Sequence, residues 1–222
     1  MPVLLTPRIR FLHVPKTGGT WVWRALQAGG VPVEAIGGDP PHPSTTHLDL
    51  SETSQYADRF TIAFVRHPLD WWRSMWAYRM RTEWAYATTD GSRPYSEGFD
   101  TSIEQVIELQ PAYLEREFAR YIGPASDPID FIGRHESLAD DLVRAMREAG
   151  EECDEPALRA YPPDNVGDYQ RFPALYPRDL AERLVGSERA TIERFYAGDP
   201  IPARLLAPAP PLRQRILRAL SR

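Results

Sequence analysis

A short segment near the start of the chain combines the residue types that bind phosphate or sulfate. It contains one lysine, two threonines and a glycine pair: Lys16, Thr17, Gly18, Gly19 and Thr20. An apolar run precedes it and a helix-compatible run follows, so backbone N–H groups and the positive end of a helix dipole converge there. The glycines permit close approach, and the other side chains add donors. We expect an anion site; the alternative is a tight turn without a ligand.

Lys16 is the only lysine of the chain, so the other 25 of its 26 basic residues are arginines. This bias indicates that lysine is replaced wherever a general positive charge suffices, and that position 16 is an exception; the alternative is that the lone lysine falls there by chance. The lysine precedes the glycines, whereas in the common nucleoside-triphosphate loop it follows the second glycine. The segment is therefore not that loop.

Arg66 and Ser74 are candidates for a second anion site. Arg66 directly follows the apolar run Phe60–Val65, and Ser74 lies eight positions later in a helical pattern. The planar fork of arginine suits a phosphate group. The end of a buried strand is also where ligands collect in open α/β folds. Each residue alone is a weak signal, and the order of the two sites along the chain strengthens both.

Alternating elements must position these residues. Runs with strand character at 9–14, 60–65 and 129–133 alternate with helical patterns at 20–26, from 70 onward and at 137–149. Such alternation predicts an α/β fold in which a central parallel sheet is flanked by helices. Arg66 then lies at the carboxyl edge of the sheet.

The rest of the chain is divided by proline and glycine. Residues 31–46 and 161–169 have the composition of loops. Helical patterns at 103–121 and 178–196 should break at Pro111 and Gly186, respectively. We predict one domain over residues 1–206, followed by a proline hinge and basic helix over 207–222.

The two motifs together resemble those of sulfotransferases that use 3'-phosphoadenosine 5'-phosphosulfate (PAPS), of both the cytosolic and the carbohydrate-modifying type. The segment Pro15–Thr20, preceded by Phe11-Leu12-His13-Val14, resembles the family's 5'-phosphosulfate loop. Arg66-His67-Pro68 with Ser74 resembles its 3'-phosphate motif. The resemblance implies a three-layer sandwich like that of P-loop NTPases. It also implies PAPS as the sulfuryl donor and adenosine 3',5'-bisphosphate (PAP) as the product.

The resemblance also assigns roles to residues. It implies that Lys16 reaches the oxygen bridging sulfate and phosphate, and that Trp21 stacks near the adenine. The segment Gly133–Leu138 resembles the family's Arg-x-Glu-x-Leu segment, which makes Glu136 a scaffold residue and Arg134 a candidate cofactor contact. The chain departs from the commonest pattern at His67, where Asp or Asn is frequent, and at Trp71, where many carbohydrate sulfotransferases have a second arginine.

Sulfuryl transfer to a hydroxyl needs a base for the acceptor proton. His13 lies inside a predicted strand, His67 beside the 3'-phosphate motif, and His135 beside Glu136. His47 closes the Pro/Gly-rich loop, and this region resembles that of the catalytic histidine in several carbohydrate sulfotransferases. We therefore expect His47 to be the base, with a surface loop histidine as the alternative reading of that position. The carboxylates of Asp49 and Glu52 are weaker candidates.

We expect the acceptor to be a hydroxyl-bearing carbohydrate or small molecule. Aromatic residues at Trp84, Tyr86 and Tyr95 could stack on a sugar or an aromatic ring. Arg79, Arg81 and Arg93 could favour an anionic acceptor, but solvated charge is the better explanation for each of them. Two other functions stay open: a phosphotransferase with a related loop, and a nucleotide-binding scaffold without turnover.

Composition excludes several other classes. The net charge is -5, and the body of the chain has no basic block, which argues against a nucleic-acid surface. No apolar run approaches the roughly 20 residues of a membrane span, and no secretory signal is evident, so we expect a cytoplasmic protein. The lone Cys153 lies among acidic residues, and no metal-ligand spacing occurs. We expect no metal.

Overall fold

Five short strands form one mixed sheet. The computed structural model describes residues 3–37, 47–82, 98–127, 129–164 and 166–208. The strands are β1 (Val3–Leu5), β2 (Ile9–Leu12), β3 (Glu34–Ile36), β4 (Phe60–Val65) and β5 (Phe131–Arg134), in the spatial order β3-β1-β2-β4-β5. β2, β4 and β5 run parallel, whereas β1 is antiparallel to both β2 and β3.

The expected parallel sheet is therefore correct for β2, β4 and β5 and wrong for β1 and β3. β1 turns back into β2 through residues 6–8, where the Ile9 N–H donates to Thr6 Oγ1 at 2.9 Å. β3 lies within the segment that its prolines and glycines marked as a loop. Each of these strands has three residues, which is too short for an alternating pattern to stand out in sequence.

Residues of the parallel strands point alternately to two hydrophobic cores, one on each face of the sheet. In β4, Ile62 and Phe64 pack into one core and Ala63 and Val65 into the other. A sheet buried on both faces gives a continuous apolar run, which is why the bounds of β4 were predictable.

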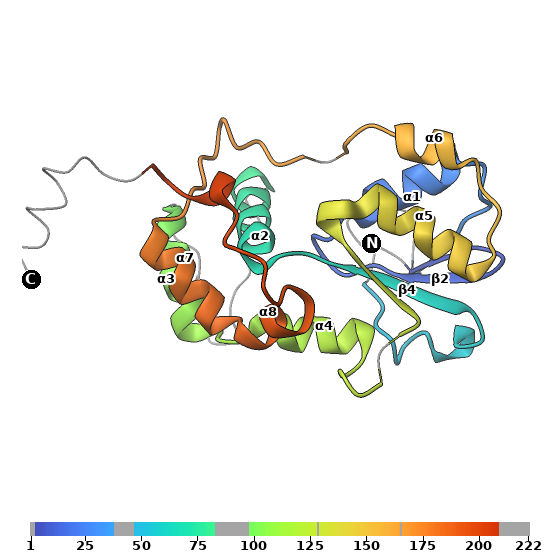
Figure 1. Cartoon of the computed structure of the whole chain (residues 1–222), viewed down its shortest axis with the longest axis horizontal. Helices are drawn as coiled ribbons and strands as arrows, with labels where there is room; N and C mark the ends of the chain where they lie inside the picture. Colours follow the sequence, from blue (N-terminus) through green and yellow to red (C-terminus); the bar gives the residue numbers. More distant parts are fainter. Residues whose placement is uncertain (1–2, 38–46, 83–97, 128, 165, 209–222) are drawn as a thin grey trace, which may run out of the picture.

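Helices cover both faces (Figure 1). One face carries α1 (Gly19–Ala28), α5 (Leu138–Ala149) and α6 (Glu155–Ala160). The other core is completed by α2 (Pro68–Thr82), α3 (Phe99–Leu109), α4 (Tyr113–Ile122), α7 (Arg178–Ser187) and α8 (Arg189–Phe195). Figure 1 shows α2, α3 and α7 grouped beyond the end of the sheet where β4 leads into α2. The α/β fold with flanking helices is confirmed.

The helix breaks follow local chemistry. The predicted break at Pro111 is confirmed, because α3 ends at Leu109 and α4 begins at Tyr113. The second break falls at Glu188 rather than at Gly186, which lies inside α7. Glu188 leaves the helix because its buried carboxylate accepts hydrogen bonds from Trp72 Nε1 and the Leu114 N–H.

Two sequence predictions cannot be compared with the fold in full. The basic helix expected at 212–222 lies outside the described residues, as do Trp84, Tyr86 and Tyr95. Among the described residues, no helix is both long enough and apolar enough to cross a bilayer.

Candidate functional site

The loop between β2 and α1 has a constrained backbone. Lys16 and Gly18 both adopt left-handed conformations, with φ of 65° and 96°. For the lysine such a conformation costs about 1 kcal/mol, a cost often found at functional sites. A Cβ on Gly19 would lie 1.8 Å from His13 Cδ2, and one on Gly18 would lie 2.6 Å from Leu138 Cδ2. Both glycines are therefore required by the packing, apart from any ligand.

Three hydrogen bonds fix the loop. Trp71 Nε1 donates to Pro15 O at 2.8 Å, Arg66 Nη1 donates to Lys16 O at 3.1 Å, and Thr17 Oγ1 donates to Val14 O at 2.8 Å. Thr17 is fully buried, so its hydroxyl supports the loop rather than facing outward. The Trp71 bond gives a structural reason for the tryptophan at this position.

Strand register brings three loop segments to one edge of the sheet. Leu12 pairs with Ala63, and Val65 pairs with Arg134. Continuing these registers, Arg66 is level with Pro15, three residues beyond the first pair, and with His135, one residue beyond the second. The sequence predicted that Arg66 would lie beside the Lys16 loop, because ligand-binding residues gather at the carboxyl edge of a parallel sheet.

The side chain of Lys16 extends along α2. Its Nζ lies 4.2 Å from the centroid of the Tyr78 ring, a cation–π contact. Burial, together with the charges of Arg66 and Arg81, lowers the pKa of Lys16 to about 7. None of the causes of this shift is a carboxylate. Within the described residues, the charges that lower this pKa are those of Arg66 and Arg81, and an anion would stabilise the charged form of the ammonium group.

Arg66 is positioned to bind an anion. Its Nη1 is used by Lys16 O, but its Nε is buried without a hydrogen-bond partner among the described residues. A buried unsatisfied donor costs about 1–3 kcal/mol, which a ligand oxygen would recover. Ser74 lies on α2, three residues after Trp71 and four before Tyr78, a spacing that places all three on one face of the helix. Because both neighbours contact the loop, Ser74 lies on the face that is turned to it.

His47 is held as a neutral imidazole. Its Nδ1 lies 3.1 Å from His13 O, and because a carbonyl can only accept, Nδ1 carries the proton and Nε2 keeps the lone pair. Burial is the largest cause that lowers the pKa of His47, to about 4. The imidazole rings of His47 and His13 are 4.9 Å apart, and His13 packs against Gly19 at the start of α1. His47 is thus linked to the loop through His13.

The two alternative carboxylates are engaged in a local turn. Asp49 accepts hydrogen bonds from Arg120, Ser51 and the Glu52 N–H, while Glu52 accepts the Asp49 N–H. Burial raises the pKa of Asp49, but the bonds from Arg120 and Ser51 outweigh it and bring the pKa to about 2. A carboxylate so stabilised is a poor proton acceptor at neutral pH.

The segment after β5 is mostly scaffold. Glu136 accepts the His67 N–H at 2.9 Å and the Tyr196 hydroxyl at 3.1 Å, in agreement with its expected scaffold role. Arg134 pairs with Asp199 at 2.9 Å and bonds Phe195 O, so it would have to leave these partners to contact a ligand.

Trp21 and Thr20 lie on the first turn of α1. Trp21 is 8% exposed, and its Nε1 donates to Pro162 O at 3.1 Å. Its indole therefore ties the loop after α6 to α1 and is not open to an adenine in this structure. Thr20 is half-buried at the helix start.

Sequence reasoning missed the part that α2 plays. Trp71 donates to the loop backbone and the Tyr78 ring contacts the Lys16 ammonium, whereas the sequence analysis gave neither residue a role at the loop. Their spacing of seven residues, which places them on one face of a helix, was the available signal. Nothing in the sequence indicated that this face meets Lys16.

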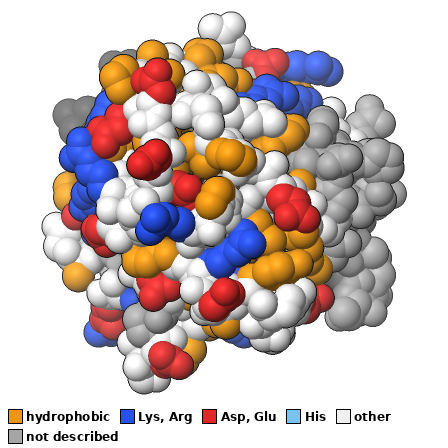
Figure 2. Space-filling model, turned by 90° about the vertical axis from the view of Figure 1, so that its right-hand side faces the viewer, with side chains coloured by type: hydrophobic (Ala, Val, Ile, Leu, Met, Phe, Trp, Pro, Cys, Tyr) orange, Lys and Arg blue, Asp and Glu red, His pale blue; other side chains and the backbone are white. Residues whose placement is uncertain are grey.

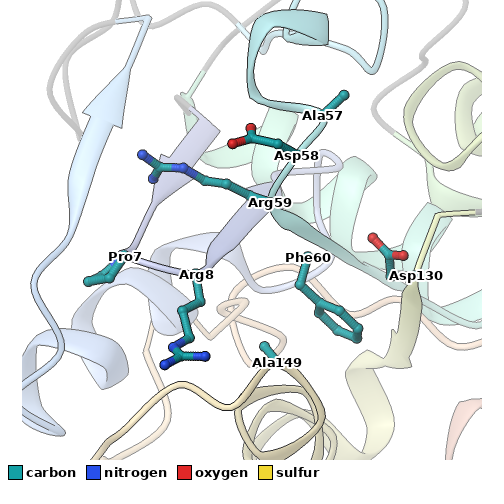
Figure 3. Close-up of a pocket in the computed structure, with 8 residues that line it drawn as sticks. All are labelled: Pro7, Arg8, Ala57, Asp58, Arg59, Phe60, Asp130 and Ala149. Atoms are coloured by element: carbon teal, nitrogen blue, oxygen red, sulfur yellow. The ribbon is translucent and has the colours of Figure 1, made fainter.

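An open cavity of about 590 Å³ lies at the opposite edge of the sheet, before β2, β4 and β5. Its lining includes Arg8, Arg59, Asp58 and Asp130, and Figure 3 shows the guanidinium groups of Arg8 and Arg59 pointing apart. On the side turned to the viewer in Figure 2, acidic, basic and apolar side chains are interspersed. The cavity shares no residue with the Lys16 loop and has no converging charge.

Comparison with known proteins leaves the site to be interpreted from its own chemistry. No family model matches the chain, and no curated protein matches it. The fold and the site define an α/β protein with a cationic cluster at the carboxyl edge of its parallel strands.

Proposed function

We propose that the chain is a PAPS-dependent sulfotransferase, which moves a sulfuryl group to a hydroxyl of a carbohydrate or small-molecule acceptor. The observation that carries the proposal is the cluster of Lys16 and Arg66: among the described residues, an ammonium group whose pKa is lowered by burial and by the charge of Arg66 lies near a guanidinium whose buried Nε has no hydrogen-bond partner. This pair needs an anion. The motif resemblance names the anion as a donor with a 5'-phosphosulfate and a separate 3'-phosphate.

The residues present fit such a donor. The loop leads into α1, which begins at Gly19, and the N–H groups of a helix start bind anions. In the proposal Arg66 and Ser74 hold the 3'-phosphate, and Lys16 with the loop N–H groups holds the 5'-phosphosulfate. The proposal includes the P-loop NTPase-like arrangement and a cytoplasmic location, with which a single cysteine agrees.

The roles of the residues follow from their protonation states. The donor supplies an electrophilic sulfur whose bond to the bridging phosphate oxygen breaks as the acceptor oxygen forms a new bond to it. In the proposal His47 accepts the acceptor's proton at Nε2, because Nδ1 is fixed by His13 O. Burial lowers the pKa of His47 to about 4, and the negative charge of the bound donor would raise it. Lys16 stabilises the charge that develops on the departing phosphate oxygen. We propose no metal and no covalent enzyme intermediate.

Isothermal calorimetry with PAP, the bisphosphate product, tests the donor assignment. We expect wild-type protein to bind PAP and not ATP with Mg²⁺, and Arg66→Ala to weaken PAP binding at least tenfold. Arg178→Ala is the matched control, because it removes an exposed arginine of α7 that has only a 3.9 Å pair with Glu182. Binding of ATP with Mg²⁺ but not PAP would contradict the proposal and favour a phosphotransferase.

Transfer of labelled sulfate from PAPS into an extract of the source organism tests turnover. We expect a labelled product with wild-type protein and a loss of at least about 100-fold with His47→Ala. PAP binding without any labelled product would instead favour a nucleotide-binding scaffold. Isolation of the product would identify the acceptor.

A further inference from the structure

The amine of Lys16 has the properties of a nucleophile when the site holds no anion. The residue is half-buried, and its Nζ contacts an aromatic ring, that of Tyr78, at 4.2 Å. Among the described residues, no carboxylate forms an ion pair with it. Burial and the charges of Arg66 and Arg81 lower its pKa to about 7, so about nine in ten molecules have a neutral amine at pH 8. A neutral amine has the lone pair that attacks an electrophile.

The surroundings of this amine favour a reaction product with negative charge. Arg66 donates one N–H to Lys16 O, and its buried Nε has no hydrogen-bond partner among the described residues. The loop also leads into the start of α1, where N–H groups and the helix dipole favour an anion. A reagent that converts the neutral amine into an anion would therefore give Arg66 an acceptor and reduce the excess of positive charge.

Carbon dioxide is an electrophile that makes this conversion. It is small and uncharged, so it can enter a cationic site without a counterion. The Nζ lone pair forms a bond to the carbon of CO2, the electrons of one C=O π bond move to oxygen, and one proton of the amine passes to water. The product is a carbamate, R–NH–COO⁻. An aldehyde would instead give an imine, which has no negative charge for Arg66 to bind.

We propose that Lys16 is a carbamate site, at which CO2 reacts with Nζ when no donor is bound and the Arg66 guanidinium binds the carbamate oxygens. The reaction itself needs only the two residues. Its consequence rests on the proposed function, in which Lys16 and Arg66 are both donor contacts. The carbamate would occupy both of them, so CO2 and PAPS would compete for the site.

The composition of the chain makes the carbamate simple to detect, because Lys16 is its only lysine. In carbon-13 NMR with labelled bicarbonate, a carbamate signal can arise only from Lys16 or from the amino terminus. We expect a signal at pH 8 that disappears in Lys16→Arg, because a guanidinium keeps its proton. At constant bicarbonate, this signal should rise with pH and reach half of its maximum by about pH 7.

A second variant tests the part that Arg66 plays. Arg66→Gln should reduce the carbamate signal of Lys16 at least about threefold, because the carbamate loses a charged hydrogen-bond donor. Arg178→Gln on α7 is the matched control, since it removes an exposed arginine whose only ion pair, to Glu182, is 3.9 Å long. It should leave the signal unchanged. Circular dichroism would show that each variant is folded.

Calorimetry connects the carbamate with donor binding. We would measure PAP binding at pH 8 in chloride and again with bicarbonate in its place at equal ionic strength. A carbamate on about two thirds of the molecules should raise the dissociation constant of the wild-type protein about threefold. The affinity of Lys16→Arg should be the same in both salts. Bicarbonate that competes as a simple anion would weaken PAP binding in both proteins alike.

Three results would overturn the inference. The first is the absence of a carbamate signal that depends on Lys16, and the second is an equal signal in Arg66→Gln and the wild-type protein. The third is an equal effect of bicarbonate on PAP binding in Lys16→Arg and the wild-type protein. Failure of the wild-type protein to bind PAP in chloride would instead defeat the proposed function. The NMR signal would still decide the carbamate, so the two failures are distinguishable.

Discussion

The affinity for PAP should fall as pH rises above 7, because the anion must bind a protonated Lys16. In the ligand-free protein, burial and the charges of Arg66 and Arg81 lower the pKa of Lys16 to about 7. A bound phosphate raises this pKa again, so binding takes up a proton. With a pKa near 7, the dissociation constant should increase about fivefold from pH 7 to 8 and about ninefold from pH 8 to 9.

Few other groups titrate in this window. Burial, with the charges of Arg66 and Arg204, lowers the pKa of His135 to about 3, and the pKa of His47 is about 4, so both histidines are neutral. Phosphate esters have a second pKa of about 6 and are dianionic above pH 7. The pH dependence between 7 and 9 therefore reports Lys16.

Calorimetry in two buffers of different ionisation enthalpy measures the proton directly. At pH 8 we expect uptake of about 0.9 proton per PAP bound. Lys16→Arg is the control, since arginine stays charged throughout this range, and its affinity should be nearly independent of pH. A pH-independent affinity in the wild-type protein, or the same slope in Lys16→Arg, would refute the reasoning.

Three further predictions concern the loop, the base and the core. Gly19→Ala should destabilise the protein by about 1–3 kcal/mol in urea unfolding, because the added Cβ would clash with the His13 ring. Gly186→Ala in α7 should stabilise it by about 0.5–1 kcal/mol, because the added Cβ would have no atom within 4 Å and alanine favours a helix over glycine. His47→Ala should lower kcat without changing the Kd for PAP, and a parallel loss of both would argue against a base. Burial raises the pKa of Glu188 to about 7, so its ionisation opposes folding as pH rises from 4.5 to 7. The wild-type free energy of unfolding should therefore fall by about 2.5 kcal/mol relative to Glu188→Gln between pH 5 and 8, and parallel pH profiles would contradict this.

Local patterns in the sequence were sufficient to predict the strands and helices that position the site. The bounds of β4 follow from a continuous apolar run, and the break before α4 follows from Pro111. Parallel strands that end together explain why Arg66 could be placed beside the Lys16 loop. These inferences succeed because periodicity, proline and glycine act on the chain within a few residues.

Contacts between distant segments determine the rest, and the sequence does not encode them in a local pattern. The contact of Lys16 with Tyr78 joins residues 62 positions apart (78 minus 16). The hydrogen bond from Trp21 to Pro162 joins residues 141 positions apart. The role of Thr17 was also misjudged, because a hydroxyl that could face an anion turns back to Val14 O instead. Protonation states such as that of His47 depend on burial, which only the folded chain defines.

The single lysine of an arginine-rich chain can now be given a physical reason. Charging Lys16 in the empty site costs about 5 kcal/mol, the equivalent of lowering its pKa from 10.5 to about 7. Lysine can release its proton when no anion is present and regain it with a ligand, whereas arginine cannot.

The stability of Lys16→Arg provides a test of this explanation without any ligand. Between pH 7 and 10.5 the unfolded chain binds more protons at Lys16 than the folded one, so this residue makes the wild-type protein more stable as pH rises. An arginine would add no such dependence. The wild-type protein should therefore gain about 2 kcal/mol over Lys16→Arg between pH 7 and 9 in urea unfolding. A constant difference would mean that Lys16 stays charged in the empty site, and that another property of lysine accounts for its presence.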